Sequence, residues 1–234
     1  MKKVLEIGCG QGFFSHVIAK NRNKNVVGVD ISKEDISIAK KRYPHVTFQY
    51  MSAESLKFKK DYFEEVYVIE VLEHVDNLDK TLDEISRVLK VNGRLVVSVP
   101  YYKSEAWLIK LRPSYFKEIH HVRVFKENQL ERLASKRKLK VTKKRRKGFL
   151  QHIELFILFK RKTKSKTQLS IGSWRDTLWT RCVHAVMLFF DPMVLHTPLV
   201  YFPVWIVTLP MGWVINAFGN NIFPKSQYYE FIKE

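Results

Sequence analysis

The strongest fold signal in this chain is the stretch Val4-Leu5-Glu6-Ile7-Gly8-Cys9-Gly10-Gln11-Gly12. Its first four residues form a short apolar run that predicts a buried strand, and the next residues after the stretch, 13–20, predict a helix. Gly8 and Gly10 allow the backbone to turn sharply and to approach a ligand without an intervening Cβ. Gly12 allows the helix to begin close to the strand. The stretch therefore predicts a strand, a ligand-binding loop and a helix in direct succession.

The first hundred residues continue this alternation of strand-like and helix-like patterns. The predicted strands are residues 4–7, 25–29, 46–50, 65–69 and 94–99. The predicted helices are residues 13–20, 33–42, with Ser32 as N-cap, and 78–90, which Asn92-Gly93 ends. A helix at 126–136 and two closing strands at 139–143 and 149–159 follow. Such repetition predicts a parallel sheet with helices on both faces, whose ligands bind at the carboxyl ends of the strands.

Positive charge is concentrated in the middle of the chain. The 234 residues carry 41 Lys and Arg against 23 Asp and Glu, a net charge of +18. Residues 101–170 hold 21 of the basic and 5 of the acidic residues, mainly in clusters at 136–147 and 160–166. Such clusters are typical of nucleic-acid or anionic-membrane surfaces, and also of a solvated, solubilising face.

The C-terminal region is apolar. Residues 192–224 contain no Asp, Glu, Lys or Arg, and residues 199–215 (LVYFPVWIVTLPMGWVI) approach the length of about 20 residues that spans a bilayer. Pro198, Pro203 and Pro210 interrupt a regular helix, so a re-entrant or interfacial, mainly helical segment is the better interpretation. The alternative is that the tail forms core, a cover over an acceptor site or a homodimer face. We therefore expect a catalytic-type domain at 1–162, a polar linker at 163–173 and a membrane-associating region at 174–234.

Compartment follows from two further observations. No apolar signal segment precedes the first strand, and two cysteines cannot form a disulfide framework. We therefore expect a cytoplasmic protein, peripheral or monotopic at the membrane.

Five segments in order resemble the class I S-adenosylmethionine-dependent methyltransferases. They are residues 6–12, 26–32, 51–54, 67–75 and 82–99, and the resemblance extends over about residues 2–160. The glycine spacing is GxGxG, with an acidic residue two positions before it, whereas the dinucleotide fingerprint is spaced GxGxxG. The resemblance implies an α/β, Rossmann-like sheet of seven mostly parallel strands with helices on both faces.

The same resemblance implies S-adenosylmethionine as cofactor. The residues assigned to its site are Glu6, Gly8, Cys9, Gly10, Gly12, Asp30, Ile31, Ala53, Glu54 and Glu70. The glycine loop would surround the methionine part, while Asp30 would bind the ribose hydroxyls and Ile31 would cover the adenine. Ala53 and Glu54 would meet the adenine edge, and Glu70 would face the methionine amino group.

Residues 70–74 resemble the O-methyltransferases of quinone biosynthesis. In that group, residues matching Glu70, Glu73 and His74 can hold a divalent cation, so the resemblance implies a site for Mg²⁺ or a related hard cation. The alternative is that His74 caps or packs the start of the next helix. We expect the general base for a hydroxyl among His121, His120 and His74, since an imidazole titrates near neutrality.

The class of methyl acceptor is predicted from a missing motif and from the apolar C-terminal region. The (Asn/Asp)-Pro-Pro-(Tyr/Phe) motif of the amino-methylating DNA enzymes is missing at the fourth strand, which argues against base N-methylation, and we do not expect a nucleic-acid partner. We expect O-methylation of an amphiphilic or lipid-linked small molecule, such as a quinone or isoprenoid precursor or a glycolipid, at a membrane surface. Three alternatives stay open: a soluble small-molecule enzyme whose tail is a lid or homodimer face, an RNA enzyme that uses the basic clusters, and a non-catalytic binding protein.

Overall fold

The computed structural model describes residues 1–22, 24–111, 114, 116, 119–147 and 224–234. The chain divides into two compact units. One unit consists of Met1–Tyr102, Phe116–Arg145 and Gln227–Glu234, and the other of Lys103–Tyr115 and Arg146–Ser226. The second unit contains most of helix α4 (Tyr102–Leu111), where the Ser104 hydroxyl donates a hydrogen bond to the Pro224 carbonyl at 2.6 Å.

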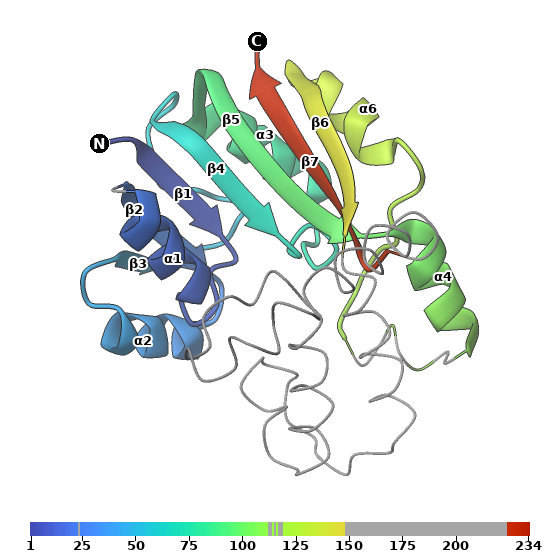
Figure 1. The fold of residues 1–234 in the computed structure, drawn as a ribbon, viewed down its shortest axis with the longest axis horizontal. Coiled ribbons are helices and arrows are strands. Elements are labelled where there is room, and N and C mark those ends of the chain that lie inside the picture. Colours follow the sequence, from blue (N-terminus) through green and yellow to red (C-terminus); the bar gives the residue numbers. More distant parts are fainter. Residues whose placement is uncertain (23, 112–113, 115, 117–118, 148–223) are drawn as a thin grey trace, which may run out of the picture. The chain divides into compact units, whose positions relative to one another are not determined.

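A seven-stranded sheet forms the frame of the first unit. Its strands are β1 (Lys3–Ile7), β2 (Asn25–Asp30), β3 (Thr47–Tyr50), β4 (Phe63–Ile69), β5 (Leu89–Pro100), β6 (Leu139–Lys147) and β7 (Ser226–Lys233). The order across the sheet is β3-β2-β1-β4-β5-β7-β6. Strands β1 to β5 pair in parallel, and Figure 1 shows β7 running opposite to β5 and β6. The predicted Rossmann-like sheet of seven mostly parallel strands is confirmed.

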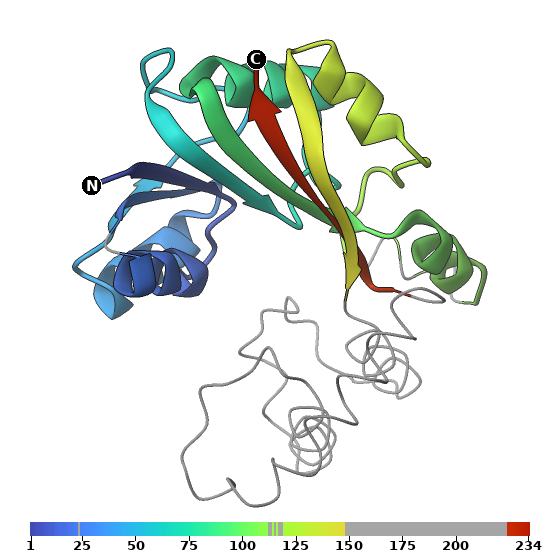
Figure 2. The ribbon, with the colours of Figure 1, turned by 45° about the horizontal axis from the view of Figure 1, so that its top comes forward.

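Helices cover both faces of this sheet. They are α1 (Phe13–Arg22), α2 (Lys33–Arg42), α3 (Leu78–Val88) and α6 (Gln129–Ser135). Figures 1 and 2 show α1 and α2 on one face and α3 and α6 on the other. Adjacent residues of β1 therefore belong to different cores: Val4 packs with the α1 and α2 side, and Leu5 packs with the α3 and α6 side. The alternation of side chains along a strand explains this division.

The second predicted helix is confirmed at both ends. It covers Lys33–Arg42, and the Ser32 side chain accepts a hydrogen bond from the Asp35 backbone N–H at 3.1 Å. Ser32 is thus the N-cap that its position predicts, because a hydroxyl satisfies a backbone donor that the first helical turn leaves free. The first helix and the first four strands also lie where the sequence predicts them, to within a few residues.

The end of α3 differs from the prediction. The helix ends at Val88, and Asn92-Gly93 lies inside β5 rather than at the helix end. Leu89 already pairs with Phe63 of β4, so the strand begins at once. The ladder shifts register after this pair, and Asn92 adopts a φ of +60°, which is the local turn that its Asn-Gly sequence favours.

The closing strand also corrects the prediction. The second closing strand expected at 149–159 lies outside the described residues, and the sheet instead receives Ser226–Lys233 between β5 and β6. The sequence reading placed these residues in the C-terminal region. Buried and partly exposed side chains alternate from Gln227 onward, and Tyr229 and Phe231 are buried in the core on the α3 side. A strand pattern of period two is therefore sufficient to explain their place in the sheet.

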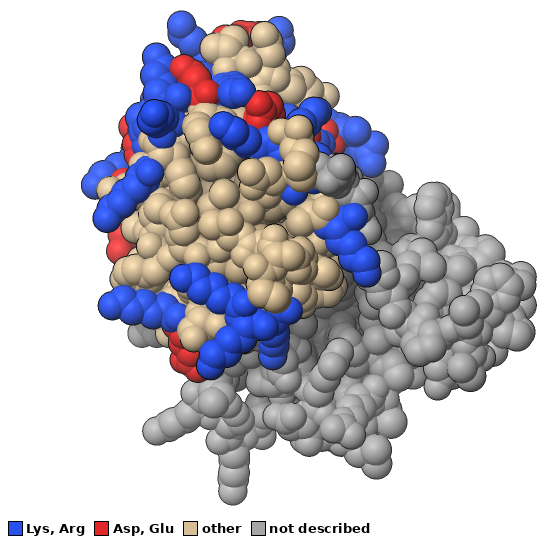
Figure 3. Space-filling model, turned by 90° about the vertical axis from the view of Figure 1, so that its left-hand side faces the viewer, with Lys and Arg blue, Asp and Glu red and all other residues tan. Residues whose placement is uncertain are grey.

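The apolar tail itself lies outside the described residues, as do the proposed linker and the basic cluster at 160–166. Among the residues that are described, no helix has the length and apolar character needed to cross a bilayer. On the side of the molecule with α1 and α2, Figure 3 shows Lys and Arg side chains at the rim, separated by uncharged surface.

Candidate functional site: a cofactor loop beside a histidine cluster

The glycine loop turns tightly at the carboxyl end of β1. The backbone N–H groups of Gly8 and Cys9 both donate to the Val29 carbonyl, at 2.8 and 3.0 Å. Gly8 has a φ of +75°, and a Cβ built there would lie 2.2 Å from Val71 Cγ2. Gly10 has a φ of +49°, and its Cβ would meet no atom within 4 Å. Gly8 is therefore required by packing, while Gly10 leaves open space at the surface of the loop where a ligand can approach closely.

Asp30 closes this loop from the neighbouring strand. Its Oδ2 accepts a hydrogen bond from the Gly10 N–H at 2.8 Å, and its Oδ1 accepts one from the Ser32 N–H at 2.8 Å. Each carboxylate oxygen retains acceptor capacity for a further donor. The structure thus holds the Asp30 carboxylate beside the open Gly10, as a ribose-binding carboxylate at the end of β2 requires.

Glu6 and Cys9 contribute to the frame beneath the loop. The buried Glu6 carboxylate accepts a hydrogen bond from the Ser15 hydroxyl of α1, and burial raises its pKa to about 8. The Cys9 side chain is buried in the core on the α1 and α2 side, and burial raises the pKa of its thiol. Gly12 ends the loop with its N–H donating to the Cys9 carbonyl at 2.9 Å. These side chains position the loop rather than its ligand.

Exposed apolar groups mark the side where an adenine is expected. Ile31 is 70% exposed directly after Asp30, and Tyr50 is 53% exposed opposite Asp30 in the paired strand β3. The sequence reading missed Tyr50; an aromatic residue at the carboxyl end of the strand next to Asp30 was the available signal. Ala53 is half-buried against the core. The Glu54 carboxylate accepts a hydrogen bond from the Asn77 N–H at 2.8 Å, so it also supports the start of α3.

Glu70 begins the turn that follows β4. It has a φ of +54°, its N–H donates to the Ser98 carbonyl at 3.0 Å, and its carboxylate accepts a hydrogen bond from the Ser98 hydroxyl. A non-glycine residue at positive φ is strained and is common at functional sites. The next residue, Val71, is the one that a Cβ on Gly8 would meet. The turn after β4 therefore lies against the glycine loop.

Three metal-ligating side chains meet in this same turn. One ligand atom from each of Glu73, His74 and His121 lies within 4.8 Å of the others. Glu73 is 1% exposed, and its Oε1 lies 4.0 Å from His74 Nε2. The rings of His74 and His121 meet edge to face at a centroid distance of 4.7 Å. The predicted residues Glu73, His74 and His121 thus come together, although 47 positions separate His74 from His121.

The segment that carries His121 is fastened to the turn after β4. The Val122 N–H donates to the Glu73 carbonyl at 3.0 Å. The Arg123 guanidinium donates to the carbonyls of Leu72, at 2.6 Å, and Asp76, at 3.0 Å. His74 Nδ1 lies 3.1 Å from the His120 carbonyl, so Nδ1 carries the proton and donates it. His120 contributes this carbonyl from a strained φ of +57°, and its ring is exposed.

These contacts define the protonation of His74. Burial lowers its pKa below the usual value, with the neighbouring His121 acting in the same direction. Because Nδ1 donates to the His120 carbonyl, Nε2 is the ring nitrogen left to accept a proton or a metal ion, and it lies 4.0 Å from Glu73 Oε1. The donor set does not match the expected Mg²⁺ site, because Mg²⁺ prefers oxygen ligands and this cluster offers two imidazoles and one carboxylate.

Comparisons with known proteins agree with this geometry. A family model described as a methyltransferase domain matches residues 5–97. The chain is 36% identical over 100 residues to a ubiquinone biosynthesis O-methyltransferase of Pelagibacter ubique, which covers 41% of each protein. It is 31% identical over 117 residues to a demethylmenaquinone methyltransferase of Chlorobaculum tepidum, covering 50% of this chain and 48% of that protein. The chain thus spans less than half the length of these curated relatives.

Solved structures share the fold. A putative sarcosine dimethylglycine methyltransferase from Galdieria sulphuraria superposes with a TM-score of 0.62 at 12% identity, over 100% of this chain and 78% of that one. The sheet order, the glycine loop with Asp30 and the matched domain lead to one conclusion. Residues 5–97 of this chain form a methyltransferase domain, similar to those of S-adenosylmethionine-dependent O-methyltransferases.

Proposed function

We propose that this protein transfers the methyl group of S-adenosylmethionine to a hydroxyl oxygen of an amphiphilic small molecule. The observation that carries the proposal is the histidine cluster beside the cofactor loop: Gly8 contacts Val71, and His74 lies three residues further along the same turn. Cofactor loop and proton acceptor therefore share the carboxyl edge of the sheet, where α/β proteins bind their ligands.

Methyl transfer to a hydroxyl requires two things of the protein: orientation of the acceptor oxygen and removal of its proton. When bound, S-adenosylmethionine supplies a methyl group that is already activated. The chain must hold the acceptor oxygen in line and accept its proton. His74 meets the second requirement, because the His120 carbonyl fixes its Nδ1 proton and leaves Nε2 as the base. His121 lies against His74 as the second candidate base, whereas His120 acts through its carbonyl.

The relatives support the acceptor class. The Pelagibacter ubique protein is named for O-methylation in ubiquinone biosynthesis, and the Chlorobaculum tepidum protein for methylation of demethylmenaquinone. Both names denote ring compounds with an isoprenoid chain. A quinone or isoprenoid precursor with a free ring hydroxyl is therefore the acceptor that we propose, with a lipid-linked sugar as the next candidate.

We also propose that the apolar region at 174–225 brings the enzyme to the cytoplasmic membrane surface, where such acceptors dissolve. Its aromatic and apolar sequence carries this part of the proposal. The RNA alternative draws less support from β6. Three of the six basic residues there are paired with acidic neighbours: Lys140 with Glu234 at 3.1 Å, Lys143 with Glu230 at 3.6 Å and Lys144 with Glu131 at 2.7 Å.

The test is methyl transfer into a fractionated extract. The full chain is incubated with methyl-labelled S-adenosylmethionine and a cell extract, and lipid, nucleic-acid, protein and aqueous fractions are separated. We expect label in the lipid fraction, in a base-stable product with the mass of a methyl ether. His74→Ala should lose at least 100-fold in rate while keeping cofactor affinity. His45→Ala, a histidine paired with His16 elsewhere, is the control that should keep full rate. Label confined to RNA or protein would refute the proposal.

A further inference from the structure

We propose that Glu73, His74 and His121 form a binding site for a transition-metal dication of the Zn²⁺ class rather than for Mg²⁺. The resemblance to quinone O-methyltransferases places a cation on Glu70, Glu73 and His74. The structure groups Glu73 and His74 with His121 instead. Replacing a carboxylate by an imidazole changes the donor set from oxygen-rich to one oxygen and two nitrogens, and this changes the metal that the site selects.

The spacing of the three ligand atoms suits one ion. They lie within 4.8 Å of one another, and the Glu73 Oε1 to His74 Nε2 distance is 4.0 Å. Zinc bonds of about 2.0–2.2 Å to nitrogen and oxygen hold cis ligand atoms roughly 3.0–3.5 Å apart. Side-chain rotations that move each ligand atom by less than about 1 Å therefore close the site. Glu70 has a different task, because its carboxylate accepts the Ser98 hydroxyl.

The orientation of His74 is the second observation. Metal-ligating histidines commonly donate their other ring N–H to a carbonyl or carboxylate, which fixes the tautomer. His74 Nδ1 donates in this way to the His120 carbonyl at 3.1 Å, and the strained φ of +57° at His120 turns that carbonyl toward the ring. Nε2 is thereby committed to the side where Glu73 and His121 lie.

The third observation is that hydrogen bonds hold the backbone segment of His121 in place. Its segment is tied to the turn after β4 by the hydrogen bond from Val122 N–H to the Glu73 carbonyl and by Arg123, which donates to the Leu72 and Asp76 carbonyls. The backbone carbonyl of the ligand Glu73 thus accepts a hydrogen bond from Val122, the residue that follows the ligand His121. Such bracing keeps two distant segments in the register that a shared ion requires.

Three protein ligands leave coordination positions open. Two histidines and one carboxylate with an open position are the pattern of catalytic zinc and non-haem iron sites. This inference rests on the proposed function: a bound ion would lie beside the acceptor hydroxyl and would favour loss of its proton to solvent. His74 and His121 would then both serve as ligands, and His74 would act as the base only in the metal-free protein.

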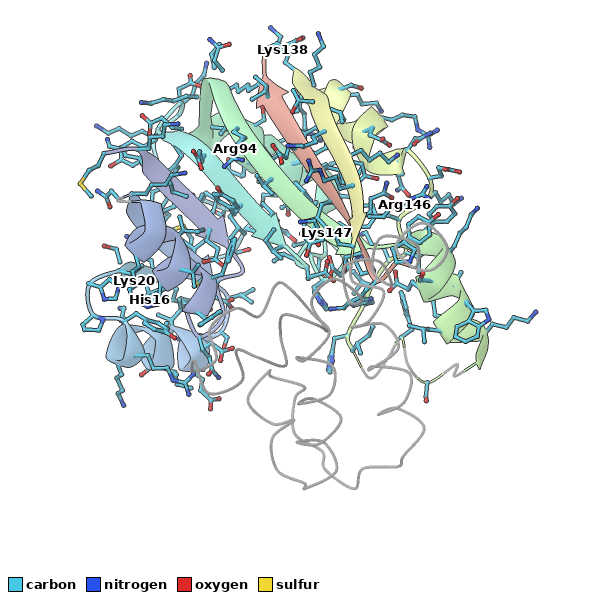
Figure 4. All side chains as sticks on the ribbon, viewed as in Figure 1. His16, Lys20, Arg94, Lys138, Arg146 and Lys147 are labelled. Atoms are coloured by element: carbon cyan, nitrogen blue, oxygen red, sulfur yellow. The ribbon has the colours of Figure 1, made fainter. Side chains whose placement is uncertain are left out.

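The experiment titrates the full chain with Co²⁺ and follows its visible absorption, which reports coordination directly. All variants carry His45→Ala, because His16 and His45 form another histidine pair, with ring nitrogens 2.9 Å apart, and Figure 4 shows His16 on α1. We expect one Co²⁺ per chain, displaced by Zn²⁺ but not by a 100-fold excess of Mg²⁺. His121→Ala should weaken Co²⁺ binding at least 100-fold, whereas Glu70→Gln should change it less than threefold.

Two results overturn the inference. If Glu70→Gln loses Co²⁺ binding and His121→Ala retains it, the ligands are Glu70, Glu73 and His74 instead. If neither variant changes Co²⁺ binding, the ion binds elsewhere in the chain. Calorimetric affinity for S-adenosylmethionine, which His121→Ala should retain, verifies that the variant is folded. Because metal binding is read without turnover, failure of methyl transfer to a hydroxyl would refute the proposed function and leave this site standing.

Discussion

Two alanine substitutions in the glycine loop separate packing from ligand binding. Both Gly8, at φ +75°, and Gly10, at φ +49°, are left-handed, and an L-residue there costs about 1–2 kcal/mol. A Cβ on Gly8 also lies 2.2 Å from Val71 Cγ2, so overpacking adds about 1–3 kcal/mol. A Cβ on Gly10 meets nothing within 4 Å. Gly8→Ala should therefore cost about 2–5 kcal/mol of unfolding free energy, and Gly10→Ala about 1–2 kcal/mol.

Urea denaturation measures these losses of unfolding free energy, and calorimetry measures the affinity of each variant for S-adenosylmethionine. The methyl group of Gly10→Ala occupies the open side of the loop, so cofactor affinity should fall at least tenfold, about 1.4 kcal/mol. The control is Gly8→Ala in a Val71→Ala background, where the clash is removed and the cost should fall to about 1–2 kcal/mol. Equal destabilisation by both single substitutions, or a Gly10→Ala variant with unchanged affinity, would refute this account of the loop.

Three further predictions concern other contacts. Asp30→Ala should weaken S-adenosylmethionine binding at least tenfold by calorimetry, and unchanged affinity would remove Asp30 from the ribose site. Because burial raises the pKa of Glu6 to about 8, its contribution to stability is complete below about pH 4.5 and is lost as the pH rises toward 8. Glu6→Gln should reduce the dependence of the melting temperature on pH over this window and should raise the melting temperature at pH 8. The same dependence on pH as in the unaltered protein would contradict this. Lys233→Met removes hydrogen bonds of 2.7 Å to Asp61 and to the carbonyls of Ser86 and Leu89. The free energy of unfolding, measured by urea denaturation, should fall by about 3 kcal/mol. Lys140→Met, at an exposed lysine, is the control and should lower it by less than about 1 kcal/mol.

The parallel half of the sheet was predictable because its signals are local. A strand, a glycine loop and a helix repeat within short stretches, and the cap at Ser32 needs only Asp35 three positions later. The cofactor loop is predictable for the same reason, since Gly8, Gly10 and Asp30 act through their own backbone and one adjacent strand.

The closing strand was not predictable in this way. Ser226–Lys233 joins the sheet from the far end of the chain, and the sequence of a strand carries no information about which two strands it will lie between. The Lys233 ammonium stabilises this position by donating to the carbonyls of Ser86 in α3 and Leu89 at the start of β5, contacts between positions more than 140 residues apart.

Periodicity and turn chemistry act between near neighbours, so the order of residues alone predicts the parallel sheet, the glycine loop and its carboxylate partner. The order of residues also points to Glu73, His74 and His121 one by one. That these three meet, and that Glu70 contacts Ser98 instead, is seen only in the folded chain. Their meeting depends on hydrogen bonds between two segments far apart in the sequence, chiefly from His74 to the His120 carbonyl and from Arg123 to the Leu72 carbonyl.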